Sequence, residues 1–571
     1  MKKKQKIAAV LDFLFMLLLG LIMVFPLFWM ARSSLMTQSE IFRKPMQWLP
    51  KIAQWKNYAD IMTMRPFARW MCNSAFIVFL IVVSIFSAKK NKEGTSGADR
   101  EYFLGGNTTP LIVLAVSYCA SAVSAGSFMG DPGMMSTIGW PYYWLAVFAV
   151  PGLTIPGIFV IRKMRLQSER YGSMTITEYV GHRFNCPGLK LYLSFVIVLC
   201  YLFMLVSQFK AAAILLEKFT GLNFSVGLII MCVVCLVYVN IGGLRSVAWT
   251  DFFQGILMCV MCVVLLAVGL NAIGGFTGLN EAIEANFPEM NKMLQPTGDQ
   301  YDIPGAYGLI GCLLFGFAIY FAQPHIAARF LALPDVNRKS IGRFLIISLV
   351  CGWLFNLMFV LGPIGRILYP DAEADYMTVT FVTNQFPSVI ASALMLGFFA
   401  AVLSTATSIL LVVGQSVGRD IYGQVCKKSA TPERQVKVTG IATTCCMILV
   451  VIFNMCNPPA FLQLFIYLGM SGIGSACVMP LVGGTLWKKA SKEGAIASAI
   501  AGPAGYIVHA NILGQSWSWA MGACVIWAVV AFFAVTLIRN AVKGPDPVLE
   551  ELWNPLGGKV DFEALNKKAK A

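Results

Sequence analysis

The chain has 571 residues, of which 57% are hydrophobic and only 13% are charged, and its mean hydropathy is +0.70. This composition is typical of an all-α protein that crosses a membrane many times, and it excludes an ordinary soluble domain. The net charge of +16 is not a sign of nucleic-acid binding, because the basic residues lie in short loops between apolar spans, where the positive-inside rule places them. We therefore expect a lipid bilayer, and no nucleic acid, as a partner.

Apolar runs of about 20 residues, the length that crosses a bilayer, predict about fourteen transmembrane helices. They are expected near residues 8–31, 72–88, 110–129, 136–161, 191–216, 224–241, 249–272, 306–323, 343–364, 386–414, 437–454, 460–486, 494–513 and 518–538. Basic loops alternate with acidic ones, of which 281–302 and 371–375 are the clearest. This alternation predicts that both chain ends lie in the cytoplasm.

The first 80 residues differ in character from the rest. The stretches 26–30, 40–42, 48–50 and 55–58 resemble the amino-terminal end of a carbohydrate ABC transporter permease. No permease body and no loop that docks an ATPase follows, so a sugar permease is disfavoured and no ATPase subunit is expected. We expect a permease-like segment over 1–80, a transport domain over 81–540 and a cytoplasmic tail over 541–571.

The apolar run 386–414 contains two adjacent hydroxyl residues, Ser404 and Thr405. In membrane helices such hydroxyls often bond back to their own helix or join two helices. A second run, 117–127, favours another role, because it is rich in Ser, Ala and Gly and precedes Gly-Asp-Pro-Gly at 130–133, so that a helix breaks there easily. Free carbonyls and hydroxyls are hard neutral ligands that suit Na⁺ better than a transition metal. The two runs together predict a sodium site.

Other chemistry is not indicated. The C-x-x-C pairs Cys232/Cys235 and Cys259/Cys262 lie in apolar spans and are interpreted as small packing residues. The sequence shows no Ser/His/Asp set, phosphate-binding loop or redox motif. We expect that the protein is not an enzyme, has no transition-metal site and needs no organic cofactor.

The helices within 110–272 and 306–486 form two sets of five. An odd number in each set means that the second set is inserted upside down relative to the first. This is the pattern of an inverted repeat, in which binding sites lie near the middle of the membrane, where the two sets meet.

Several stretches resemble the sodium:solute symporter family. The matching segments are 101–106, 175–185, 242–251 and 323–330, with 457–459 and 480–484 most similar to the sodium/pantothenate branch, and the resemblance runs from about residue 82 to the end of the last helix. It implies a LeuT-like five-plus-five inverted repeat with extra helices, alternating access, Na⁺ as the coupling ion and the inner membrane of a bacterium. A passive channel and a symporter-like sensor are disfavoured.

The resemblance also implies site residues. Sodium would be held by the carbonyls of Ala120, Val123 and Ala401 and by the hydroxyls of Ser404 and Thr405. Asp251 matches an acidic residue that helps sodium leave toward the cytoplasm, and a charge at a helix start beside water explains it equally well.

The expected substrate is a small organic solute. Pantothenate or another small carboxylate is the first candidate, and a proline-like amino acid is the alternative, although Ala122 and Gly316 stand where the proline branch has Asp and Trp. Lys210 either meets a substrate carboxylate or extends to the outer headgroups. An anionic substrate would favour a second sodium ion, for which the candidate ligands are the hydroxyl of Ser408 or those of Ser121 and Ser124. The predicted substrate contacts are Ser121, Ser124, Ser127, Gln208, Lys210 and Tyr320.

Overall fold

The computed structural model describes residues 32–41, 47–64, 78–79, 82–83, 98–292, 305–426, 431–456, 462–562 and 565. The chain forms two compact units, Met1–Ala75 and Phe76–Ala571. The predicted helix 8–31 lies outside the described residues, and so does most of the predicted helix 72–88.

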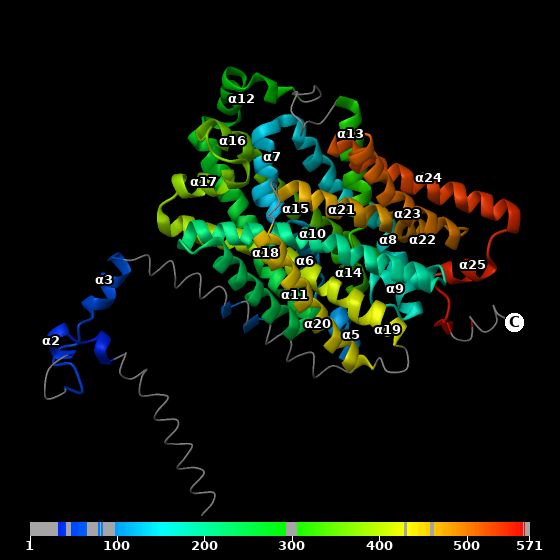
Figure 1. Cartoon of the computed structure of the whole chain (residues 1–571), viewed down its shortest axis with the longest axis horizontal. Coiled ribbons are helices and arrows are strands. Elements are labelled where there is room, and N and C mark those ends of the chain that lie inside the picture. The colour runs from blue at the N-terminus through cyan, green and yellow to red at the C-terminus, as the bar shows by residue number, and fades with distance from the viewer. Residues whose placement is uncertain are drawn as a thin grey trace, which may run out of the picture. The chain divides into compact units, whose positions relative to one another are not determined.

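The described part of the first unit contains two short helices, α2 (Gln38–Ile41) and α3 (Lys56–Met64) (Figure 1). The amide of Asn57 donates to the carbonyls of Ser34 and Met36, at 2.9 and 3.2 Å. These contacts hold the start of α3 against the turn that precedes α2.

Helices make up almost all of the described second unit (Figure 1). They are α5 (Ala98–Leu104), α6 (Leu111–Ala122), α7 (Asp131–Ile138), α8 (Tyr143–Tyr171), α9 (Ile176–Arg183), α10 (Pro187–Thr220), α11 (Phe224–Ala272), α12 (Gly275–Asn286), α13 (Gly305–Leu314), α14 (Pro324–Ala332), α15 (Arg338–Asn356), α16 (Leu361–Leu368), α17 (Met377–Gln385), α18 (Ser388–Gln415), α19 (Tyr422–Val425), α20 (Pro432–Cys456), α21 (Leu462–Val478), α22 (Gly484–Leu486), α23 (Lys492–Ile507), α24 (Trp517–Lys543) and α25 (Pro547–Trp553).

The predicted class of an all-helical protein with many membrane spans is confirmed, but not the number of fourteen. Within the described residues, nine helical segments are long and apolar enough to cross a membrane, or eleven if each of two bent pairs is one span. The predicted helices 224–241 and 249–272 are both present within α11, where they meet at a kink at Gly243 (φ +57°), and the apolar part of the first, Phe224–Val237, is too short to be counted as a span. Glycine takes this positive φ at little cost, so the chain turns there without a loop.

The predicted break in the run 117–127 is present. Helix α6 ends at Ala122, Val123 is extended (φ −95°, ψ 124°), and helical structure resumes at Gly126. A second bend of 43° separates Gly308–Tyr320 from Pro324–Ala332. Gln323, the residue before Pro324, is extended (φ −67°, ψ 120°), as a residue before proline prefers to be.

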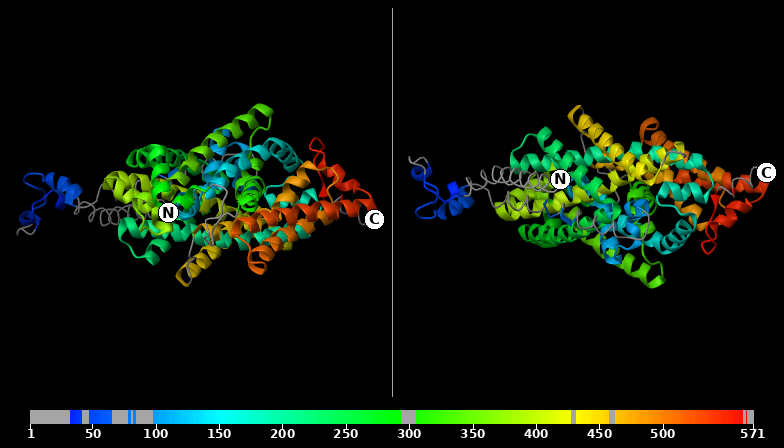
Figure 2. Two further views of the ribbon diagram at one scale, coloured as in Figure 1. Left: turned by 90° about the horizontal axis from the view of Figure 1, so that it is seen from above. Right: turned by 90° about the horizontal axis from the view of Figure 1, so that it is seen from below.

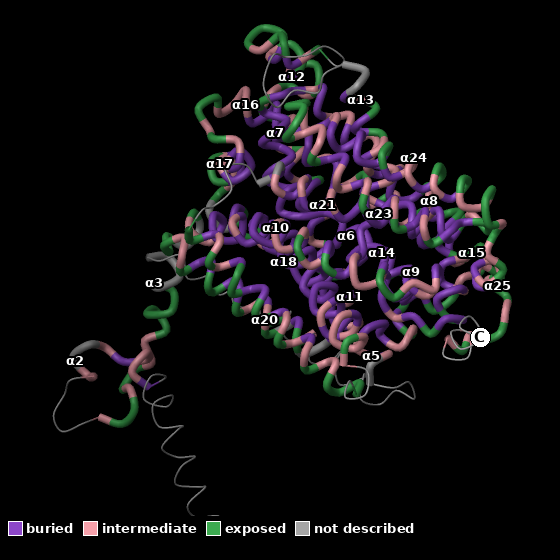
Figure 3. Tube along the Cα trace, turned by 45° about the vertical axis from the view of Figure 1, so that its right-hand side comes forward, coloured by how far each residue is buried: buried purple, intermediate pink, exposed green. Residues whose placement is uncertain are grey.

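Helix α18 lies in the interior of the second unit. Its most apolar window is 94% buried, whereas those of α20 and α23 are 28% buried. Figure 3 shows the same contrast, with α6 and α21 largely buried and the outer side of α20 exposed. Helix α6 contacts α11, α15 and α18, so the break after α6 opens among buried helices and not at the surface.

The C-terminal segment folds back on the helices. Beyond α24, helix α25 lies at one end of the second unit (Figure 2). Arg170 of α8 donates to the backbone carbonyls of Glu551 and Asn554, at 2.6 and 2.9 Å. Part of the predicted tail 541–571 is therefore docked on α8.

Candidate functional site

The five positions of the predicted sodium site meet where the break after α6 faces α18. The Ser404 hydroxyl lies 3.0 Å from the carbonyl oxygen of Ala120 and 3.1 Å from that of Ala401. The Thr405 hydroxyl lies 2.8 Å from the carbonyl oxygen of Val123. All five residues are buried. The last carbonyls of a helix lack partners within the helix, so at the end of α6 the carbonyls of Ala120 and Val123 are available to a cation together with the two hydroxyls.

Asp251 lies next to this cluster but belongs to a different network. Its Oδ2 pairs with the guanidinium of Arg329 at 2.9 Å and accepts hydrogen bonds from Ser117 (2.7 Å) and Ser121 (3.1 Å). Arg329 also donates to the hydroxyl of Ser408 at 2.7 Å. The interpretation of Asp251 as a charge at a helix start beside water is wrong, because the residue is fully buried inside α11. The hydroxyls of Ser121 and Ser408 are engaged by this ion pair.

A small cavity of about 30 Å³ borders the sodium cluster. Val123, which offers its carbonyl to the cluster, also lines the cavity. Ser127 and Asp131, on the segment that follows the break, and Tyr320 also line it. The cavity and the cluster therefore share one short stretch of backbone, so that a ligand in one can influence the other.

The carboxylate of Asp131 is held by two tyrosines. The hydroxyls of Tyr142 and Tyr467 donate to its Oδ1, at 2.6 and 2.8 Å. Tyr467 comes from α21, and its ring stacks on Trp517 at a centroid distance of 5.5 Å. This arrangement gives the cavity one acidic group and a largely aromatic surround.

The predicted substrate residues are distributed over several roles. Ser127 and Tyr320 line the cavity. Ser121 joins the network of Asp251, and the Ser124 hydroxyl accepts from the backbone N–H of Gly126 at 3.1 Å. Gln208 accepts from the backbone N–H of Ala125 at 3.0 Å, so that it supports the backbone at the break.

Lys210 has a partner that the sequence did not indicate. Its ammonium lies 3.1 Å from the carboxylate of Asp375, and both side chains are mostly buried, at 14% and 11% exposure. Asp375 belongs to the acidic loop 371–375. In this structure Lys210 therefore ties α10 to that loop.

Sequence reasoning missed the roles of Asp131 and Arg329. Asp131 was noted only as part of a turn, although an acidic residue beside an apolar run is by default a functional candidate. The chain distance explains why its partners were not found, since Tyr467 is 336 positions away. Arg329 lay within a family motif, and nothing local indicated its contact with Asp251.

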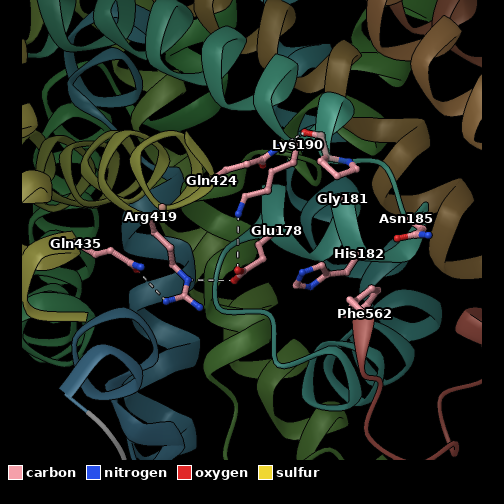
Figure 4. Close-up of a pocket in the computed structure, with 11 residues that line it drawn as sticks. Glu178, Gly181, His182, Asn185, Lys190, Arg419, Gln424, Gln435 and Phe562 are labelled. Carbon is pink, nitrogen blue, oxygen red and sulfur yellow. Dashed lines mark hydrogen bonds and ion pairs between the residues drawn. The ribbon is translucent and has the colours of Figure 1, made fainter. Parts of the chain in front are cut away.

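A second polar pocket, of about 260 Å³, lies between α9, α10 and the end of α18. Figure 4 shows Lys190 and Arg419 both pointing at Glu178, with distances of 3.7 and 3.1 Å to its carboxylate oxygens. Burial raises the pKa of Glu178, but the charges of Arg419 and Lys190 outweigh it and hold the pKa below its ordinary value. The ring of Phe562 stacks on His182 at 4.3 Å. This pocket is filled by an internal ion-pair network.

Comparisons with known proteins give a consistent result. The model of the Sodium:solute symporter family matches residues 102–502. The chain is 26% identical to the high-affinity proline transporter PutP of Bacillus subtilis (strain 168), over 81% of this chain and 96% of that protein. It is also 26% identical to the sodium/pantothenate symporter of Escherichia coli (strain K12), over 77% of this chain and 89% of that protein.

Solved structures agree on the fold. A substrate-bound, outward-open Na⁺-coupled sialic acid symporter matches with a TM-score of 0.71 at 19% identity, over 82% of this chain and 97% of that one. Mhp1, a nucleobase–cation symport-1 family transporter in a closed conformation, matches with a TM-score of 0.51 at 14% identity, over 79% and 98%. The expected LeuT-like fold is therefore confirmed.

Proposed function

The chain belongs to the sodium:solute symporter family, whose members are transporters and not enzymes, and on this premise we propose that it imports a small organic solute together with Na⁺ by alternating access. Its multi-span fold and bacterial relatives are consistent with the inner membrane. We propose that both termini lie in the cytoplasm, as the alternation of basic and acidic loops predicts.

The observation that supports sodium coupling best is the oxygen cluster between α6 and α18. Three backbone carbonyls and two hydroxyls converge there, all uncharged and buried. Such a cluster offers full ligation to a monovalent cation that has lost its water, and two of its carbonyls, those of Ala120 and Val123, come from a broken helix, as in other transporters of this architecture. We propose Ala120, Val123, Ala401, Ser404 and Thr405 as the sodium ligands.

Asp251 is proposed to help sodium leave. The hydroxyl of Ser121 contacts Asp251, and the backbone carbonyl oxygen of Ser121 lies 3.2 Å from the Thr405 hydroxyl. Ser121 therefore links the sodium cluster to the carboxylate of Asp251. Arg329 balances the charge of Asp251. A sodium ion that leaves the cluster would therefore meet the carboxylate of Asp251, whose attraction for the ion is reduced by Arg329. The reduced attraction lets the ion pass on toward the cytoplasm and does not hold it at Asp251.

Pantothenate or another small carboxylate remains the first substrate candidate from the sequence, with a proline-like amino acid as the alternative. The two curated relatives are equally identical to this chain, so similarity does not separate them. The argument for an anion site is weakened, because Lys210, the lysine that could meet a substrate carboxylate, pairs with Asp375.

Uptake by the purified protein in proteoliposomes tests the proposal. Labelled pantothenate and labelled L-proline are each offered under an inward sodium gradient and under an equal potassium gradient. We expect accumulation of one of them in sodium and not in potassium. Equal uptake in both salts, for either solute, would show transport without sodium coupling and would contradict the proposal.

A further inference from the structure

Asp131 differs from the other buried aspartates. The described residues contain four of them, Asp131, Asp251, Asp375 and Asp420. The other three each have a basic partner within 3.4 Å: Arg329 for Asp251, Lys210 for Asp375 and Lys190 for Asp420. Within the described part of the chain, Asp131 has hydroxyl partners but no basic one.

A buried carboxylate without a counter-charge is costly, and a bound cation is one way to remove that cost. Both tyrosine hydroxyls donate to Oδ1 of Asp131, and the hydroxyl of Ser127 also hydrogen-bonds to this carboxylate. Asp131 is only 3% exposed and lines the cavity. A ligand with a positive charge would supply the counter-charge that these hydroxyls do not.

The walls of the cavity indicate which kind of cation fits. Tyr320, Phe355, Phe359 and Tyr467 line it, and the faces of aromatic rings attract organic ammonium groups. Divalent and transition metal ions are usually held by several acidic, His or Cys side chains, and the described residues hold no group of three or more of these that could bind one. The volume of about 30 Å³ is enough for a head group the size of a water molecule.

A further acceptor lies beside the cavity. Gln463 hydrogen-bonds to Tyr467, and its Oε1 is buried without a hydrogen-bond partner. The same amide packs against Gly126 and Gly130, on either side of Ser127. Buried amide oxygens without a partner also occur at Gln254, Gln323 and Asn454, so Gln463 is distinguished by its place beside the cavity, where a ligand can complete it.

We propose that the transported solute carries a protonated amine, which pairs with Asp131 inside the aromatic cavity between α7, α15 and α21. This inference rests on the proposed sodium symport and specifies the substrate class of the same site: an amino acid or a related ammonium compound, and not pantothenate, whose only nitrogen is an uncharged amide. The ammonium binds next to Val123, so that solute and sodium share the backbone of the broken helix.

The test uses the purified full chain and pairs of ligands in which the nitrogen is a protonated amine in one member and an uncharged acetamide in the other. The probes are the proteinogenic amino acids, compared with their N-acetyl counterparts and with pantothenate. The thermal unfolding midpoint is measured in sodium and in potassium, and binding of ²²Na⁺ is measured separately. We expect at least one amine to raise the midpoint in sodium and its N-acetyl counterpart to leave it unchanged.

Asp131→Asn should weaken that amine by about ten- to a hundred-fold, the loss expected of one hydrogen bond to a charged group, while ²²Na⁺ binding is kept. The comparison of wild-type ligand pairs does not depend on this variant, so the inference stays testable if the variant does not fold.

The outcomes separate the two proposals. Three results would each overturn the amine inference and leave sodium symport standing. They are stabilisation by pantothenate or by an N-acetyl compound, no response to any amine in protein that binds ²²Na⁺, and unchanged amine affinity in Asp131→Asn. Amine binding that is the same in sodium and potassium would support the inference and contradict sodium coupling.

Discussion

Removing both hydroxyls of the oxygen cluster should abolish tight sodium binding. In Ser404→Ala combined with Thr405→Ala, a bound Na⁺ would lose two of its five proposed ligands. A hydrogen bond to a charged group contributes about 1.5–3 kcal/mol, and we take the same range for each hydroxyl–sodium contact. Two contacts then amount to about 3–6 kcal/mol. At about 1.4 kcal/mol per factor of ten, the sodium affinity should fall by about 10²- to 10⁴-fold.

The same change has a smaller effect on folding. Without sodium, the Ser404 and Thr405 hydroxyls donate to the carbonyls of Ala120 and Val123. Losing a partner costs a buried carbonyl about 1–3 kcal/mol, so the unfolding midpoint without sodium should fall moderately and cooperative unfolding should persist. Thr405→Ser keeps a hydroxyl and should keep most of the sodium affinity.

Direct ²²Na⁺ binding to detergent-purified protein is the assay. The control is Ser475→Ala combined with Thr439→Ala, which removes one serine and one threonine hydroxyl that are fully buried and bond back to their own helices. The control should bind sodium as the wild type does. If the Ser404/Thr405 variant is folded and also binds sodium with unchanged affinity, the assignment of the cluster is refuted.

Three further predictions concern contacts away from the cluster. Lys210→Gln breaks the ion pair with Asp375 and should lower the free energy of unfolding by about 3–5 kcal/mol, with equal effects on all transported solutes, as thermal unfolding and competition uptake will show. Glu178→Gln should lower the free energy of unfolding by a similar amount at neutral pH. The pKa of Glu178 in the folded protein is held below its ordinary value of 4.5, so the ionised carboxylate stabilises the fold above pH 4.5 and this stabilisation is lost as the pH falls further. The stability difference between the variant and the wild type should therefore shrink in acid. Deletion of residues 1–71 should leave sodium-dependent uptake unchanged, because they lie in a separate compact unit.

Each of these predictions has a control and a contrary result. Lys218→Gln, on the same helix as Lys210, should destabilise less, and a selective loss of anionic solutes in Lys210→Gln would show that this lysine serves the substrate. Glu169→Gln removes a partner of Arg165 that is 55% exposed and should be nearly neutral; a pH-independent effect of Glu178→Gln would contradict the charge argument. Loss of folded protein on deletion of 1–71 would show that this unit is needed by the transport domain.

Sequence patterns predicted the features that are local in the chain. Long apolar runs placed α10, α18, α20 and α24 to within a few residues, because membrane length fixes the length of the run. The break in the run 117–127 was also predicted, because a run of small residues supports a helix poorly. The Gly-Asp-Pro-Gly stretch at 130–133 does not break the helix, since it lies in the helical segment that resumes at Gly126. The pair Ser404 and Thr405 stood out because hydroxyls are unusual in so apolar a helix.

The features that the sequence did not predict are contacts between side chains that are far apart in the chain. Asp131 meets Tyr467 across 336 positions, Lys210 meets Asp375 across 165, and Arg329 meets Asp251 across 78. A single sequence records the residue types but not these contacts. The consequence for function is large, because Lys210 alone favours an anion site, whereas its pairing and the unpaired Asp131 favour an ammonium site.

The most direct test of the central claim is whether sodium and solute cross the membrane together. Proteoliposomes are prepared with the same total sodium concentration inside and outside, and ²²Na⁺ is added only to the outside. They are then given an inward gradient of an isotopically labelled amino-acid mixture, and entry of ²²Na⁺ and of the solute is measured in the same sample. Coupled transport predicts that solute entry drives ²²Na⁺ inward and that Ser404→Ala with Thr405→Ala removes this flux. Solute entry without any ²²Na⁺ movement would contradict sodium symport.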